Sequence, residues 1–437
     1  MFKYILYLIF LLFITNFVCA KETPLIKHWQ TNNAVAVYFV RTTQLPMLDV
    51  RMLFNAGSAQ DEKLYGLANL TGMMLNEGTK KLNNNQIAEK FDDLGTQFGV
   101  HVNRDASIAG LRCLTKKAIL LPSIELLHDI ISQPVFLNKE LKRIKRQILI
   151  EIAAQQQLPS VVATKTFYAA LYKDFPYAHA VIGNKKTIAS IDRSDVIKFY
   201  QQHYTAKNAI LVLVGNISQV TAKALANKIT ADLPSGKTIK KLSPPSPVTE
   251  DLTKQIKFPG TQSYIRIGCL GLNYNDPHLF PILVGNYILG AGVLVSRLFT
   301  EIRQKYGLSY SVKSKFIALK NRGPFLMLLQ TKNRSTQQAL ELTKSVLNKF
   351  IQNGPTKKEL LDAKKFLLGN FALQLDSNAK IANTISIITF YNLPLNYLDT
   401  YKKNIRAVTM QGVKKAFQTI IGKQKLVTIL VGQNMSS

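Results

Sequence analysis

The same order of strand-like and helix-like segments occurs twice along this chain, and this repetition constrains the fold more than any other feature. The first half opens with the alternating runs VAVYFVRT and LDVRMLFNAG and closes with the apolar run AILVLVGNI. The second half opens with SYIRIGCLGL and closes with KLVTILVG. Each half carries helical segments, a pair of strands and long amphipathic helices in between, which indicates duplication of a unit of roughly 200 residues.

Strands and helices come in groups within each half rather than in strict alternation. Such grouping favours antiparallel-rich sheets with helices packed on one face over a doubly wound parallel sheet. The segment between the halves, LPSGKTIKKLSPPSPVTEDLTKQ, is rich in Pro, Ser and Lys and has no apolar period, which is typical of a linker. We therefore predict an α+β fold of two homologous domains, residues 21–235 and 257–437, joined by a linker over residues 236–256.

Residues 1–20, MFKYILYLIFLLFITNFVCA, have the pattern of a secretory signal peptide. Lys3 precedes an apolar run that ends at Val18, and Val18 and Ala20 fit the small residues of a cleavage site. An uncleaved membrane anchor is an alternative, although the run is shorter than the ~20 residues of a span. A lipoprotein is a second alternative, but a lipoprotein signal has a smaller residue than Val18 directly before its cysteine, here Cys19. We expect export to the periplasm, with no stable membrane insertion after signal cleavage.

The chain carries a formal net charge of +30, most of it from lysine. A nucleic-acid-binding protein is one class with such a charge. The lysines are dispersed, however, no nucleic-acid-binding motif is present, and export removes the chain from nucleic acids. We therefore expect no nucleic-acid partner, and the basic surface favours acidic peptides or an acidic partner protein.

Two cysteines, Cys113 and Cys269, follow the predicted cleavage site and lie in strand-like runs of different halves. Buried free thiols are the favoured interpretation, and a disulfide between them is the alternative in an oxidising compartment. The histidines show no paired spacing of a metal site, so we expect none of them to bind zinc. They are His28, His101, His128, His179, His203 and His278.

Four stretches carry a combined signature: residues 54–79, which end in GLANLTGMMLNEGT, and residues 177–218, 288–312 and 355–379. Together they resemble the pitrilysin/insulinase metallopeptidase family, in its short branch that includes the mitochondrial processing peptidase. The resemblance extends over nearly the whole chain after the signal peptide. It implies the two-domain α+β fold and a zinc site on a helix with the motif HxxEH.

The HxxEH motif has a clear physical basis. Histidines at positions i and i+4 lie on one face of a helix and can hold one Zn²⁺, and the glutamate acts as general base on the metal-bound water. The resemblance places Asn69, Gly72 and Met73 at these three positions and Glu151 at the third ligand, on a later helix. Asn and Met are poor zinc ligands. We therefore expect no metal or other cofactor in this chain, with Glu151 as a solvated or salt-bridged helix residue.

The second half keeps another part of the family pattern. In the family, an Arg and a Tyr seven residues apart reach across a closed chamber to the substrate at the zinc site. Arg303 and Tyr310, in RQKYGLSY, match them, and both side chains can donate to a peptide carbonyl or a developing oxyanion. The alternative is a solvated helix arginine and a strand tyrosine. Ser296 and Arg297 also match the family, and for these a structural role is favoured.

The resemblance also implies a partner. In the short branch, one protomer often carries HxxEH and the other carries the Arg/Tyr pair, and the two enclose a chamber for peptides. This chain is predicted to be the non-catalytic subunit of a periplasmic heterodimeric zinc metallopeptidase, inactive alone, with zinc in an HxxEH-bearing homologue. The alternative is a peptide-binding or scaffold protein with no part in proteolysis. A third possibility is an active peptidase with an unrecognised site. The sequence supplies neither the metal ligands nor the nucleophile that such a site would need.

Overall fold

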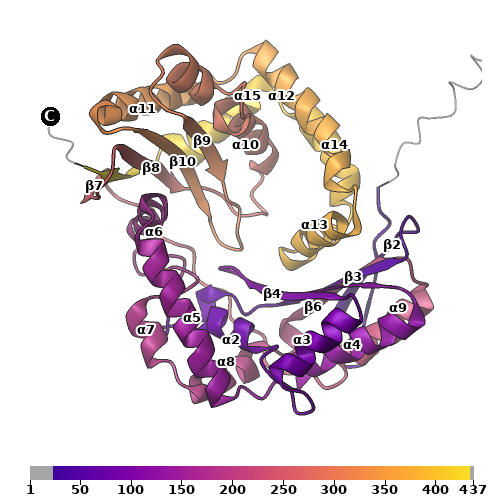
Figure 1. Cartoon of the computed structure of the whole chain (residues 1–437). Coiled ribbons are helices and arrows are strands. Elements are labelled where there is room, and N and C mark those ends of the chain that lie inside the picture. The colour runs from indigo at the N-terminus through magenta and orange to yellow at the C-terminus, as the bar shows by residue number, and fades with distance from the viewer. Residues whose placement is uncertain (1–22, 434–437) are drawn as a thin grey trace, which may run out of the picture.

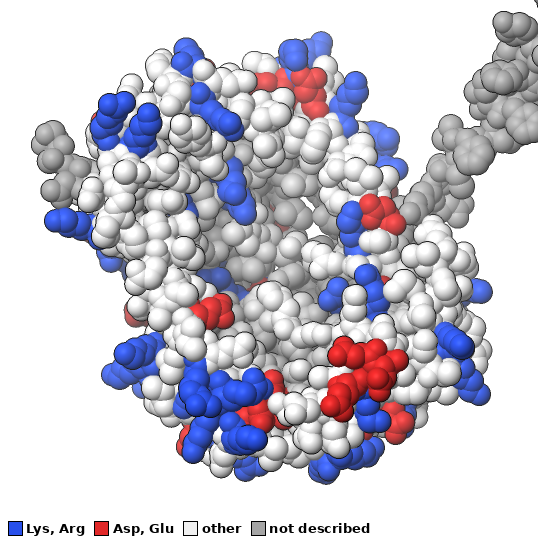
Figure 2. All heavy atoms as spheres, in the orientation of Figure 1, with Lys and Arg blue, Asp and Glu red and all other residues white. Residues whose placement is uncertain are grey.

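The structure, a computed structural model, describes residues 23–433, and the expected signal peptide lies outside this range. Two mixed β-sheets, each with its own helices, form the two halves of the molecule (Figure 1). Figure 2 shows that the face seen in this orientation is hollowed between the halves, and that Lys and Arg are spread over both of them. No helix within residues 23–433 has the length and apolarity to cross a membrane.

The first sheet has six strands in the order β1-β2-β6-β3-β5-β4. Only β2 and β6 run parallel, and every other neighbouring pair is antiparallel. The strands are β1 (Lys27–Gln30), β2 (Ala36–Arg41), β3 (Met47–Phe54), β4 (Gln97–Val102), β5 (Ser107–Leu114) and β6 (Ala209–Gly215).

The second sheet repeats this arrangement in the order β7-β11-β8-β10-β9, with β7 and β11 as its parallel pair. The strands are β7 (Leu252–Lys257), β8 (Gln262–Leu270), β9 (Ser311–Phe316), β10 (Pro324–Lys332) and β11 (Val427–Gly432). The closing strand of each half, β6 or β11, takes the same place in its sheet. The predicted α+β fold of two similar halves is thereby confirmed, although β7 begins inside the segment expected to be linker.

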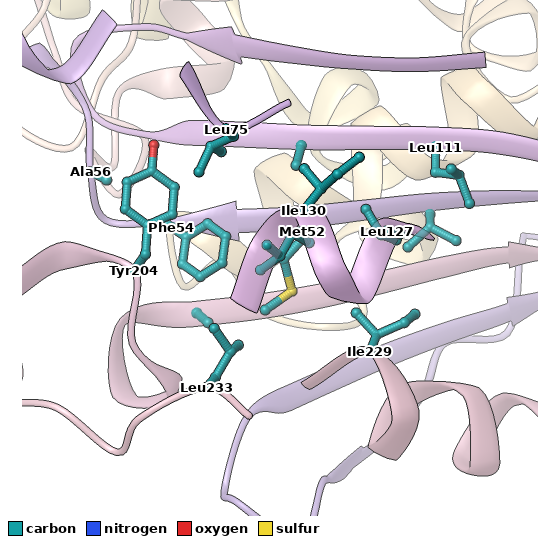
Figure 3. Close-up of a cluster of buried hydrophobic side chains, with 14 of the residues drawn as sticks. Met52, Phe54, Ala56, Leu75, Leu111, Leu127, Ile130, Tyr204, Ile229 and Leu233 are labelled. Carbon is teal, nitrogen blue, oxygen red and sulfur yellow. The ribbon is translucent and has the colours of Figure 1, made fainter. Parts of the chain in front are cut away.

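Most helices of each half cover one face of their own sheet. The first half contains α2 (Leu67–Met74), α3 (Asn84–Asp93), α4 (Lys117–Ser132), α5 (Asn138–Gln156), α6 (Pro159–Tyr172), α7 (Lys185–Ser190), α8 (Arg193–His203) and α9 (Gln219–Thr230). The second half contains α10 (Leu279–Asn286), α11 (Thr336–Asn353), α12 (Lys357–Asn370), α13 (Asn378–Phe390), α14 (Tyr397–Ala407) and α15 (Met410–Phe417). Figure 3 shows Met52 and Phe54 of the first sheet among side chains of α4 and α9, such as Ile130 and Ile229.

Local sequence signals set several helix boundaries. Asn83 caps α3 by accepting a hydrogen bond from the backbone N–H of Gln86, whose side chain accepts one from Asn83 in return. Gly95 follows the end of α3 with φ +56°, a conformation that favours glycine.

Two helices cross from one half to the other. Helix α6 belongs to the first half by sequence, yet its Phe167 and Leu171 pack against β11 of the second sheet. Helix α13 belongs to the second half, and its Ile381 and Ile385 pack against β3 and β6 of the first sheet. Each sheet is therefore covered on one face by its own helices and on the other by a helix of the opposite half (Figure 1).

A buried carboxylate joins the two halves between these helices. Asp105, in the turn between β4 and β5, accepts hydrogen bonds from the hydroxyls of Tyr177 and Tyr391, the latter at 3.1 Å. Asp105 also accepts a hydrogen bond from the backbone N–H of Lys320 at 2.9 Å. The Tyr177 hydroxyl accepts one from the backbone N–H of Asn321 at 3.2 Å. Because Lys320 and Tyr391 come from the second half, this carboxylate holds the β9–β10 connection and the end of α13 against the first half.

Strand β4 lies directly against helix α2. A Cβ atom added to Gly72 of α2 would lie 2.7 Å from Cγ2 of Val102 and 3.3 Å from Cγ1 of Val100, both on β4. Valine has one short, branched side chain with little freedom to move away. Glycine at position 72 is therefore required by this close approach of a strand to a helix.

Cys113 on β5 and Cys269 on β8 are buried free thiols, in agreement with the favoured interpretation. Burial raises the pKa of each thiol to about 12. Both side chains stay protonated at neutral pH and act as small apolar core residues.

We predict that Asp105→Ala destabilises the whole chain. The substitution leaves two tyrosine hydroxyls and one backbone N–H without their acceptor in a buried place, which costs roughly 2–4 kcal/mol in the free energy of unfolding. Tyr391→Phe removes one of these hydrogen bonds but keeps the ring that stacks on Tyr274, so it should cost about 1 kcal/mol. Urea denaturation measures both changes, and equal losses for the two variants would contradict the proposed role of Asp105.

We predict that Gly72→Ala destabilises the chain by about 1–3 kcal/mol because the new methyl group overpacks against Val102. The matched control is Gly369→Ala in α12, where a Cβ meets no atom within 4 Å. That control should stabilise the chain by up to about 1 kcal/mol, as alanine does in an open helix position. Thermal denaturation of both variants gives the comparison, and a stabilising Gly72→Ala would show that β4 does not close over α2.

Candidate functional site

Helix α2 starts from a fixed loop. Its N-cap residue, Gly66, has φ +97°, and a Cβ there would lie 2.7 Å from Ile188. The buried carboxylate of Asp61 accepts the backbone N–H groups of Gly66 and Ala68, each at 2.7 Å. An acidic side chain at this end also complements the helix dipole. The family-like residues before the helix therefore orient α2 rather than take part in chemistry.

A histidine completes this loop. His179 Nε2 lies 3.0 Å from Asp61, and the ring of His179 stacks on Tyr65 at 4.3 Å. Burial raises the pKa of Asp61, while the hydrogen bonds from His179 and the backbone lower it. His179 thus has a packing and hydrogen-bonding role. The pairing with Asp61 was missed, because the two residues lie far apart in sequence.

The positions of the zinc motif are occupied by groups that contact one another or the protein. Asn69 Nδ2 lies 3.7 Å from the sulfur of Met73, and Gly72 faces Val102. Glu151 lies on α5, which packs beside α2, and its exposed carboxylate accepts a hydrogen bond from Gln155 at 3.0 Å.

Zinc does not fit this arrangement. An amide and a thioether are poor partners for Zn²⁺ compared with imidazole, and the site offers one carboxylate, on Glu151. The place of the general base has no side chain, and β4 closes the space that a glutamate would need. Within residues 23–433, no three His, Cys, Asp or Glu side chains gather as metal ligands would.

The histidines occupy separate places. Three of them each pair with one carboxylate: His128 with Asp232 at 3.2 Å, His179 with Asp61 at 3.0 Å and His278 with Asp276 at 2.9 Å. His203 is buried against Phe199, and burial lowers the pKa of its imidazole to about 4. These contacts are structural ones.

Arg303 lies in a segment with unusual backbone geometry. The predicted helix over this region is π-helical from Phe299 to Lys305, and a second π-helical turn spans Tyr287–Ala291. Such turns are rare and are often found at functional sites. Arg303 is exposed, and its guanidinium carbon lies 5.0 Å from the ring centre of Phe299.

Tyr310 directly precedes β9, the edge strand of the second sheet, and 69% of its surface is exposed. Within residues 23–433, neither Arg303 nor Tyr310 makes a side-chain hydrogen bond or an ion pair, and none joins them to α2 or α5. Both side chains are available to a molecule outside this chain.

Arg297 has a different environment, although it lies only six residues before Arg303. Its guanidinium donates to both carboxylate oxygens of Glu359, at 2.6 and 2.7 Å, and to the carbonyl of Gly354 at 3.0 Å. Ser296 is buried, and its hydroxyl accepts the backbone N–H of Phe299 at 3.4 Å. The structural role favoured for Arg297 and Ser296 agrees with these contacts.

Three consecutive apolar side chains are exposed between the two π-helical segments. Val293, Leu294 and Val295 expose 79%, 64% and 68% of their surface. Isolated exposed apolar residues are common, but a contiguous group marks a contact surface. The loop lies within the family-like stretch 288–312, where the run GVLVS has no polar residue before Ser296.

Comparisons with known proteins agree with this description. Residues 37–185 match the family described as "Insulinase (Peptidase family M16)", and residues 190–367 match "Peptidase M16 inactive domain". The crystal structure of a peptidase M16 inactive domain from Pseudomonas fluorescens superposes with a TM-score of 0.91 at 35% identity, over 94% of this chain and 99% of that one.

Two curated relatives are also similar over most of their length. The "Non-peptidase homolog YmxG" of Helicobacter pylori is 28% identical over 90% of each chain. The mitochondrial-processing peptidase subunit beta of Mus musculus is 22% identical over 77% of this chain and 70% of the relative. The chain therefore belongs to the insulinase family, peptidase family M16.

Proposed function

We propose that this chain is the non-catalytic subunit of a periplasmic heterodimeric zinc metallopeptidase. Its partner is an exported homologue with an intact HxxEH motif, which holds the zinc. The chain supplies Arg303 and Tyr310 to bind and polarise the peptide at the partner's site. The observation that carries this proposal is the contrast between the two halves: the zinc positions are filled and closed, whereas Arg303 and Tyr310 are exposed and unpaired.

The two side chains suit a peptide carbonyl. A guanidinium and a phenol hydroxyl are both hydrogen-bond donors. Donors aimed at a carbonyl oxygen stabilise the negative charge that develops during attack on the peptide bond. Within the described residues no carboxylate forms an ion pair with Arg303, which leaves its charge available for this use.

The surface near these residues supports a partner or a peptide. Val293, Leu294 and Val295 lie in the same region as Arg303 and would lose their exposure to water on contact, which stabilises association. The net charge of +30 favours an acidic partner or acidic peptides. The signal-peptide pattern of residues 1–20 supports the periplasmic location.

We predict that Arg303→Ala lowers kcat/KM of the reconstituted two-chain peptidase on the order of 100-fold, since it removes a donor to the reacting carbonyl. Tyr310→Phe should lower it on the order of 10-fold, because only the hydroxyl is lost. A fluorogenic peptide assay with the HxxEH-bearing partner measures both effects. Size-exclusion chromatography shows that each variant still forms the complex.

Arg334→Ala is the matched control, because Arg334 is also an exposed arginine of the second half. It should leave kcat/KM unchanged. If Arg303→Ala and Tyr310→Phe behave like this control in an active complex, the chain is a scaffold or a peptide-binding protein and takes no part in proteolysis.

We predict that the chain purified alone holds far less than one zinc per molecule and does not cleave peptides. The reason is that Asn69 and Met73 replace two imidazoles, and Gly72 replaces the base. Inductively coupled plasma mass spectrometry gives the zinc content before and after dialysis against a weak chelator. If the chain alone held one zinc per molecule and the Glu151→Gln variant lost it, this chain would bind zinc itself. That result would contradict the assignment of the zinc to the partner.

A further inference from the structure

A small cavity lies where the segment between the halves crosses their junction. Its volume is about 170 Å³. The first half contributes Asn55 and Asp105, the second half contributes Asn275 and Lys320, and the connecting segment contributes residues 240–242. Pockets for drug-sized ligands have roughly 300–1,000 Å³, so this cavity has room for a small ion or molecule.

The cavity has an excess of positive charge. Lys240, Lys241 and Lys320 line it, against the single carboxylate of Asp105. The oxygens of Asp105 are already used by two tyrosine hydroxyls and a backbone N–H. In the described part of the chain, none of the three ammonium groups forms an ion pair with a carboxylate.

All three lysines are partly open to solvent, and the positive charges of Lys241 and Lys320 repel each other. The Lys320 ammonium lies 5.2 Å from the ring centre of Phe390, which also lines the cavity. Burial lowers the pKa of Lys320; Asp105 raises it, and the neighbouring charge of Lys241 lowers it. Two ammonium groups close enough to repel each other favour an anion between them.

The remaining polar groups of the wall are side-chain amides. Asn275 donates to the carbonyl of Tyr391 at 2.9 Å. The side chains of Asn55, Asn321 and Asn392 also line the cavity, and within residues 23–433 their amides form no hydrogen bond. An amide NH₂ group has two donors. The wall therefore offers unused neutral donors beside unpaired cations.

We propose that this cavity binds a small, multiply charged oxyanion of the size and chemistry of inorganic phosphate. Lys241 and Lys320 supply the charge, and the free asparagine amides donate to the remaining oxygens. Because the wall comes from both halves and from the segment between them, an anion bound here links the halves. The site shares no residue with α2, Arg303 or Tyr310, so it is independent of the proposed role in proteolysis.

The test is a titration of the full chain with inorganic phosphate, at constant ionic strength maintained with sodium chloride. Ligand that binds only the folded state raises Tm in proportion to RT ln(1 + [L]/Kd). We expect a saturable rise in Tm and a matching heat of binding in isothermal titration calorimetry. The double variant Lys241→Gln/Lys320→Gln should bind phosphate at least about tenfold more weakly. The loss of one charge-assisted hydrogen bond already raises Kd by about tenfold or more.

The double variant Lys237→Gln/Lys315→Gln is the matched control. It removes the same charge at two exposed lysines outside the cavity wall, and it should bind phosphate like the original chain. If loss of Lys320 impairs folding, Lys240→Glu on the exposed connecting segment provides a second variant, with at least about tenfold weaker binding expected. No saturable effect in the original chain, or equal binding in the cavity and control variants, would overturn the proposal.

Discussion

The reciprocal packing of α6 and α13 on the sheets of the opposite halves is the interaction on which the rest of the structure depends. It explains why the central strands are apolar on both faces. In β6, Leu211 and Leu213 face the helices of the first half, whereas Val212 and Val214 face the side covered by α13. A sheet with one wet face would show polar side chains at alternate positions. Neither half can therefore bury its sheet without the other, and the two form one folding unit around Asp105.

The sequence was sufficient to predict the elements whose pattern is local. The apolar runs of β2, β3, β6, β8, β10 and β11 and the capping signals of α3 are visible without the fold. Strands β1 and β7 were missed because they lie at sheet edges and consist largely of exposed polar residues, as in KHWQ and LTKQIK. Helices α6 and α13 were not assigned, since their apolar faces are directed at the other half and lack a single amphipathic stripe.

The sequence predicts which positions of the zinc helix differ from the HxxEH motif, but not how closely the neighbouring strand packs on that helix. Asn69, Gly72 and Met73 can be read from the motif, whereas the contact of Gly72 with Val102 depends on the path of β4. A carboxylate at position 72 would need both space and a polar environment, and here two valines occupy that space. A buried charge without a partner is strongly unfavourable. At Gly72 the close packing of β4 on α2 leaves no room for a carboxylate side chain.

Arg297 and Arg303 show how the structure separates a structural residue from an available one. Both match the family and lie in one short segment, so the sequence alone distinguishes them only by analogy. Arg297 is held by Glu359, by a carbonyl and by the ring of Phe350, 4.9 Å away, and it anchors the segment to α12. Within residues 23–433 the Arg303 guanidinium forms no hydrogen bond or ion pair, and it lies over the ring of Phe299 on its own turn. The contacts of Arg297 therefore fix the segment that carries the exposed Arg303, and such preorganisation is what the proposed role of Arg303 requires.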